Sequence, residues 1–96
     1  MEPLWRVKSG SFAGWRMHDR LYDTMGINIG FFTDNHAFTL EGKYLGQIFR
    51  TGQIGFNEEA TPPIVRPEPS RSARISAAPF ADQDGIAVSG WTDPEF

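Results

Sequence analysis

The chain has no cysteine among its 96 residues, which excludes disulfides and thiolate metal sites. No stretch approaches the roughly 20 apolar residues that span a membrane. Glu2-Pro3 follows Met1 without the basic and apolar segments of a secretory signal, so we expect a cytoplasmic protein that does not bind membranes. A net charge of −3 argues against a general nucleic-acid partner.

Catalytic motifs are also missing. There is no thiol nucleophile, and no serine lies in a Gly-x-Ser-x-Gly elbow. The glycine spacing fits neither dinucleotide-binding nor phosphate-binding loops. Most carboxylates fall in expected turns or near the C-terminal end, so no acid/base pair is predicted. The sequence therefore favours a protein that is not an enzyme, and it predicts no cofactor and no metal.

Glycines, by contrast, recur with a fixed period. They form three pairs of identical internal spacing, each 16 residues after the one before: Gly10 and Gly14, Gly26 and Gly30, Gly42 and Gly46. The chain thus divides into units at 5–20, 21–36 and 37–52, with a partial fourth unit at 53–56. A repeat this short is one hairpin long.

Turn residues recur about every eight positions, and the intervals between them are rich in aromatic and β-branched residues. This pattern predicts an all-β fold, an antiparallel meander of short hairpins with an approximately 16-residue repeat. The predicted strands cover 5–8, 11–17, 21–24, 27–33, 37–40, 43–50 and 53–56. An open meander leaves two exposed edges, which closure into a barrel, radial repetition or symmetric assembly would remove.

Side-chain alternation along the long strands predicts two faces. The apolar face, expected to be the core, contains Ala13, Trp15, Met17, Ile27, Ile29, Phe31, Leu45 and Phe49. The other face has a glycine in the middle of each unit, flanked by large side chains. Something must pack against these glycines, either a neighbouring aromatic ring or a second subunit.

The composition changes after residue 56. We expect a β-repeat domain over 1–56, a Pro/Arg-containing linker or arm over 57–79, and a segment over 80–96 that docks on the β domain through Trp91. Five of the seven prolines lie between 62 and 79. The arm is either a solvated linker or a segment lying across a neighbouring subunit.

A folded unit of about 60 residues buries only roughly 60% of its unfolded surface, and small scaffolds of this kind often oligomerise. Together with the open edges, this favours a homo-oligomer, and a tetramer in particular. The predicted interface contains Phe12, Phe32, Tyr44 and Ile48 on the glycine-bearing face.

One polar rim deserves comparison with a metal site. His18 and Asp34 occupy the same position of the repeat, and His36 follows nearby. With Asp23 they offer imidazole and carboxylate ligands. The segments around His18 and Asp34 are both predicted to be turns, however. His, Asp and Asn are common in turns because of their backbone preferences, and we favour that role.

The hairpins resemble the small bacterial "4-fold beta flower" proteins, a family of uncharacterised function. The matching segments are 21–32 (LYDTMGINIGFF) and 42–49 (GKYLGQIF), followed by a Pro/Arg-rich segment at 62–69 (PPIVRPEP). The resemblance covers roughly residues 5–70 and implies a compact β assembly with four-fold character, without an activity.

These observations favour a structural or interaction module that self-assembles and presents a surface to a protein partner. The alternative is a ligand- or metal-binding protein, or a small enzyme, with its site at a subunit interface.

Overall fold

The computed structural model describes all 96 residues and contains eight strands and no helix. The all-β prediction is confirmed. The strands are β1 (Glu2–Arg6), β2 (Phe12–Met17), β3 (Arg20–Tyr22), β4 (Asn28–Thr33), β5 (His36–Thr39), β6 (Tyr44–Arg50), β7 (Gln53–Asn57) and β8 (Trp91–Thr92).

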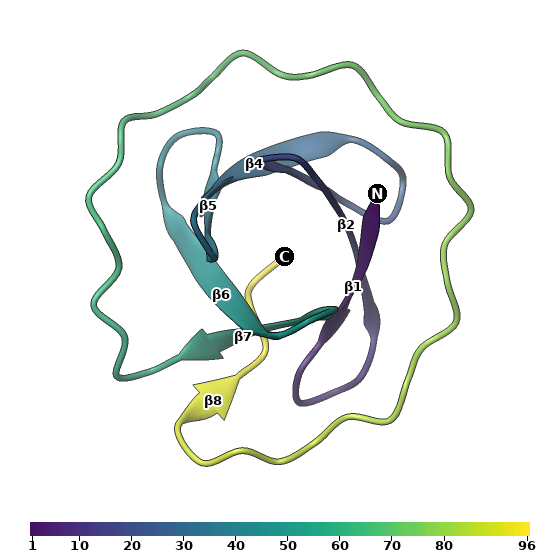
Figure 1. The fold of residues 1–96 in the computed structure, drawn as a ribbon, viewed down its shortest axis with the longest axis vertical. Coiled ribbons are helices and arrows are strands. Elements are labelled where there is room, and N and C mark those ends of the chain that lie inside the picture. The colour runs from purple at the N-terminus through teal and green to yellow at the C-terminus, as the bar shows by residue number, and fades with distance from the viewer.

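The first seven strands form a closed barrel (Figure 1). Each strand pairs antiparallel with the next, as predicted for a meander. The first and last then meet, and Trp5 and Arg6 of β1 pair with Gln53 and Ile54 of β7. This last pairing is parallel because an odd number of alternating strands brings two of the same direction together. Closure leaves no open edge between β1 and β7, so of the three ways to remove the exposed edges the chain uses closure into a barrel.

The second glycine of each pair marks a place where two backbones approach closely. The register shifts opposite Gly14, Gly30 and Gly46, where bulges occur in the β1–β2, β3–β4 and β5–β6 pairs. A Cβ atom at any of the three would lie less than 3.0 Å from a backbone carbonyl oxygen of a neighbouring strand. We had expected an aromatic ring or a second subunit to pack against these glycines. Instead, the backbone of the neighbouring strand fills the space.

The bulges also change which side chains face inward. Ala13 and Leu45 lie in the barrel interior as predicted, but Trp15 lies in an outer cluster with Phe12 and Tyr22. A bulge adds one residue and so reverses the alternation that follows it. The interior cluster consists of Leu4, Ala13, Leu21, Phe32, Ala37, Leu45 and Ile54.

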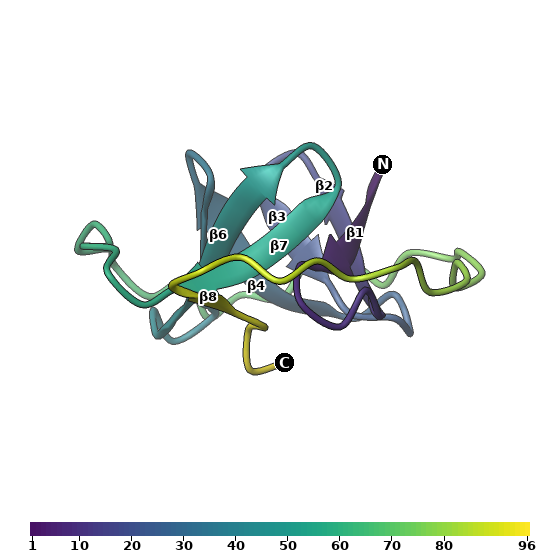
Figure 2. The ribbon, with the colours of Figure 1, turned by 90° about the horizontal axis from the view of Figure 1, so that it is seen from below.

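Residues 58–90, here called the belt, run once around the outside of the barrel (Figures 1 and 2). The belt contains no strand, which suits its prolines because they have no N–H to donate to a ladder. It is attached to the hairpin turns at one end of the barrel. The attaching amides donate to backbone carbonyls at 2.8–2.9 Å: Glu68 to Leu40, Ile75 to Gly26, Gln83 to Gly10 and Ile86 to Val7.

The belt covers the outer aromatic cluster of Phe12, Trp15 and Tyr22. Ile75 and Ala77 pack against this cluster, and the Phe80 ring stacks on Phe12 at 5.7 Å between centroids. This part of the second face of the sheet is therefore covered by the same chain. For residues 57–79 we considered a solvated linker or an arm on a neighbouring subunit; here they lie on their own barrel.

The C-terminal segment also packs on the barrel. β8 pairs antiparallel with the end of β7, and Trp91 packs edge-on against Phe49 at 4.9 Å. The carboxylate of Asp93 accepts hydrogen bonds from the amides of Lys8 and Ser9. Phe96 packs against the interior cluster, and the chain ends near the barrel axis (Figure 1).

Candidate functional site

The predicted polar rim is formed by two hairpin turns. His18 and Asp34 have φ angles of 56° and 54°, and each begins the two-residue turn that joins a strand pair. Among residues other than glycine, His, Asp and Asn are the ones that adopt this left-handed conformation most often. The turn geometry thus accounts for both residues without a ligand.

Arg16 holds the two turns together. Its guanidinium donates to the carbonyl of His18 at 3.1 Å and to that of Asp34 at 2.9 Å. The same group lies over the Phe32 ring, 4.2 Å from the centroid. The two turns therefore lie close together, as their shared position in the repeat predicted. Their backbone carbonyls are joined by Arg16, a residue that the sequence analysis did not single out.

His36 and Asp23 have other partners. Nδ1 of His36 lies 3.0 Å from the hydroxyl of Tyr44, which in turn lies 3.2 Å from Gln47 Oε1. Oδ1 of Asp23 accepts hydrogen bonds from the amides of Met25 and Ile27 within its own turn. No group of three or more His, Asp or Glu side chains is placed to hold a metal ion.

The residues predicted for a subunit interface divide into two pairs. Phe12 and Phe32 are only 5% and 4% exposed in the single chain, so they offer almost no surface to a partner. Tyr44 and Ile48 are half-buried. Of the four, only Tyr44 lines a pocket.

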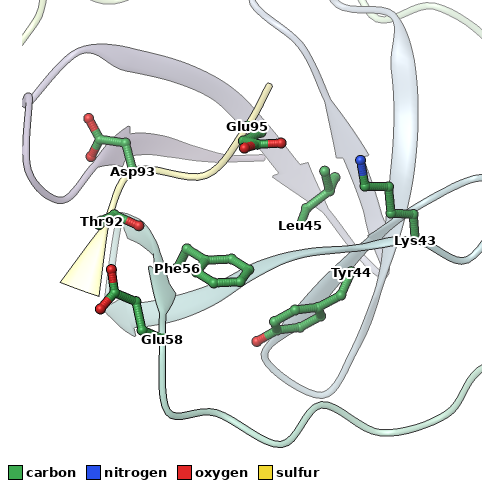
Figure 3. A pocket seen from close by; sticks show the side chains of 8 residues that line it. All are labelled: Lys43, Tyr44, Leu45, Phe56, Glu58, Thr92, Asp93 and Glu95. Carbon is green, nitrogen blue, oxygen red and sulfur yellow. The ribbon is translucent and has the colours of Figure 1, made fainter. Parts of the chain in front are cut away.

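That pocket has a volume of about 450 Å³ and lies where β6 and β7 separate (Figure 3). The last residues that pair between these strands are Gln47 and Gly55. Beyond them Tyr44 pairs with β5, whereas Phe56 pairs with β8. The pairing between β6 and β7 thus ends before Tyr44 and Phe56, and a pocket opens between the two strands. It is lined by Lys43, Tyr44, Leu45, Phe56, Glu58, Thr92, Asp93 and Glu95.

Two aromatic rings stand side by side in this pocket. The centroids of Tyr44 and Phe56 are 5.8 Å apart, with an angle of 54° between the ring planes (Figure 3). Burial raises the pKa of the Tyr44 hydroxyl above its usual value of 10.0. Tyr44 therefore stays neutral at physiological pH, and it contributes an uncharged ring to the pocket wall.

The charged groups around the rings are mostly unpaired. Asp93 is engaged by the amides of Lys8 and Ser9, but Lys43, Glu58 and Glu95 make no side-chain hydrogen bond or ion pair within the chain. The chain's one ion pair joins Arg20 and Glu68, elsewhere on the surface. The pocket thus carries three carboxylates against one ammonium group.

A second pocket of about 350 Å³ lies between the β3–β4 turn and the belt. It is lined by Met25, Arg74, Ile75, Ser76 and Ala77, and Nε of Arg74 already donates to the carbonyl of Met25. This second pocket lacks a group of unpaired charges and aromatic rings.

Sequence reasoning did not find the larger pocket. Its residues come from segments 43–45, 56–58 and 92–95, which only β8 brings together. The cost of leaving Trp91 exposed was the signal that the end of the chain docks on the barrel.

Comparison of the chain with protein-family models, with curated proteins and with solved structures gives no match. The resemblance to the 4-fold beta flower proteins thus stays a prediction from the hairpin motif. No helix in the structure is long and apolar enough to cross a membrane.

Proposed function

We propose that the protein is an interaction module without catalytic activity, and that it binds its partner at the pocket between β6, β7 and β8. The observation that carries this proposal is the set of unpaired charged groups around the Tyr44 and Phe56 rings. Binding sites commonly combine an apolar wall with a few polar groups of this kind.

The rest of the molecule supports a scaffold role. The barrel interior is filled by apolar side chains, so no ligand cavity lies along its axis. His18, Asp34, Asp23 and His36 serve turns or pair with a neighbouring tyrosine. In the pocket, charged groups without partners in the chain stand beside the half-buried rings of Tyr44 and Phe56.

Amide NMR spectra of the full chain test this proposal. The protein is titrated separately with short peptides, nucleotides, sugars, oligonucleotides and divalent metals. We expect at least one class to shift the amide signals of Phe56 and Thr92, while those of the second pocket, such as Ser76, stay in place. If no class shifts Phe56 and Thr92 at millimolar concentration, the proposal is wrong.

The structure removes two of the reasons for expecting self-assembly, the open sheet edges and the uncovered outer aromatic side chains. The edges are closed by the β1–β7 pairing, and the outer aromatic cluster is covered by the belt. The tetramer stays a prediction from the sequence, and it is not needed for the pocket, which is formed by one chain.

A further inference from the structure

We propose that the pocket between β6, β7 and β8 receives a cationic side chain, Arg or Lys, of a partner polypeptide. This inference rests on the proposed function and names its ligand class. The juxtaposition that supports it is a pair of aromatic rings beside unpaired carboxylates in a pocket of about 450 Å³.

The aromatic pair supplies the first part of the argument. A cation is attracted to the face of an aromatic ring, and it binds better where two rings form adjoining walls. Tyr44 and Phe56 form such walls, with ring planes tilted by 54°. In Figure 3 the two rings project from their strands toward one another.

The charges supply the second part. Glu58, Asp93 and Glu95 line the pocket together with the single ammonium group of Lys43. The excess of two negative charges favours a cation over an anion such as a phosphate. Figure 3 shows Lys43 near Leu45 and away from Glu58, so the ring faces nearest Glu58 are free of a competing ammonium group.

The shape of the site favours a side chain over a free small molecule. Lys43, Glu58 and Glu95 are all exposed, so the pocket is open to solvent along its charged margin. An open site encloses one side chain, while the backbone that carries the side chain lies along the outside. Most of a free metabolite would stay in water here, whereas ligand pockets usually bury most of the ligand's surface.

The test is a titration of the full chain, at 0.15 M salt, with an acetylated and amidated Gly-Arg-Gly peptide and its Lys counterpart. The matched control replaces Arg with citrulline, which has nearly the same shape and no charge. We expect the charged peptides to shift the Phe56 and Thr92 amides saturably, and citrulline to bind at least about threefold more weakly. Equal binding of the Arg and citrulline peptides would overturn the inference.

Three variants test the sign of the electrostatic effect. Glu58→Gln should weaken Arg-peptide binding about threefold, whereas Glu59→Gln, the same change one residue outside the pocket, should have a smaller effect. Lys43→Gln should strengthen binding. The inference is wrong if Glu58→Gln and Glu59→Gln act equally, or if Lys43→Gln weakens binding.

The aromatic wall needs a variant that keeps the fold. Phe56→Leu retains apolar volume in β7 and removes the ring face, so we expect weaker binding of the Arg peptide with an unchanged pattern of barrel amide signals. If Phe56→Leu binds as tightly as the natural chain, the aromatic pair has no role and the inference fails. Should an anionic or uncharged class shift the same amides while the Arg and Lys peptides do not, the interaction module would stand and the cationic ligand would be wrong.

Discussion

At the scale of single residues, Gly30 shows why glycine recurs every 16 positions. It lies at a bulge where the carbonyl of Phe38 approaches, and a Cβ atom there would lie less than 3.0 Å from that oxygen. The Phe38 carbonyl belongs to a strand and cannot move without breaking the β4–β5 pairing. Steric overlap, rather than a left-handed backbone, is what excludes a side chain at this position.

Gly30→Ala should therefore destabilise the fold by about 3 kcal/mol or more, measured by urea unfolding. Gly90→Ala is the matched control, because Gly90 has a φ of 80° but no atom within 4 Å of the added Cβ. The control should lower the free energy of unfolding by only about 1–2 kcal/mol, because its one cost is a side chain on a left-handed backbone. Equal losses in the two variants would show that the carbonyl contact is unimportant.

Asn28 is the buried polar residue that joins the barrel to the belt. Its Nδ2 donates to the carbonyls of Leu21 and Gly30, and its Oδ1 accepts from the amide of Ser72 at 3.0 Å. Asn28→Ala leaves these groups without their partner, so it should lower the free energy of unfolding by about 2–3 kcal/mol.

The control for Asn28 is Asn57→Ala. Asn57 bonds only to the nearby amide of Glu59, in an exposed turn. Loss of this hydrogen bond should lower the free energy of unfolding by less than about 1 kcal/mol. A milder effect at Asn28 than at Asn57 in chemical denaturation would contradict the coupling between barrel and belt.

Tyr44 gives the fold a dependence on alkaline pH. Burial raises its pKa above 10.0, so the folded state holds this proton more tightly than the unfolded state. The resulting stability is fully present below pH 10 and declines as the pH rises through the folded-state pKa. Urea unfolding at several values between pH 9 and 11.5 should show this decline, and it should be smaller in Tyr44→Phe. An equal decline in both proteins would assign the effect to other groups.

At the scale of elements, the belt is held at regular intervals rather than along its length. The amides of Glu68, Ile75 and Gln83 bond to the successive turns of the β5–β6, β3–β4 and β1–β2 hairpins. The contacts are seven or eight residues apart along the belt, whereas the hairpins repeat every 16 residues along the barrel. The belt thus contacts each of these three hairpin turns once.

Hydrogen exchange measures this attachment. The amides of Glu68, Ile75, Gln83 and Ile86 should exchange more slowly than other belt amides, such as those of Arg66 and Ala78, because only the first group donates to barrel carbonyls. NMR-detected exchange at neutral pH resolves the two groups. Uniformly fast exchange across 58–90 would show that the belt is detached in solution.

At the scale of the whole molecule, the attached belt makes the chain compact. The Cα radius of gyration is 12.5 Å, the same as the value of about 12.5 Å expected for a folded chain of this length. A detached belt would enlarge the particle, while a tetramer would raise both its mass and its radius.

Small-angle scattering combined with light scattering distinguishes these states. Because one chain closes its own edges and covers its own outer aromatic cluster, we expect the mass of one chain and a radius close to that of the compact structure. A larger radius at the mass of one chain would indicate a detached belt. A fourfold mass would restore the tetramer that the sequence favoured.

Local pattern was sufficient to determine the class of fold. Glycine, Asp and Asn at eight-residue intervals specify turns, and the residues between them favour strands, so the sequential antiparallel hairpins and their 16-residue repeat could be predicted. The positions of His18 and Asp34 in turns follow from the same backbone preferences. None of these features depends on contacts between distant parts of the chain.

Closure, the bulges and the pocket depend on such distant contacts. Whether β1 meets β7 is decided by the twist and curvature accumulated over seven strands, and a single bulge moved Trp15 from the predicted core to the outside. The belt and β8 bring residues 58–95 against residues that precede them by as many as 85 positions. The candidate site exists only after these contacts form, because its charges and rings come from three separate segments.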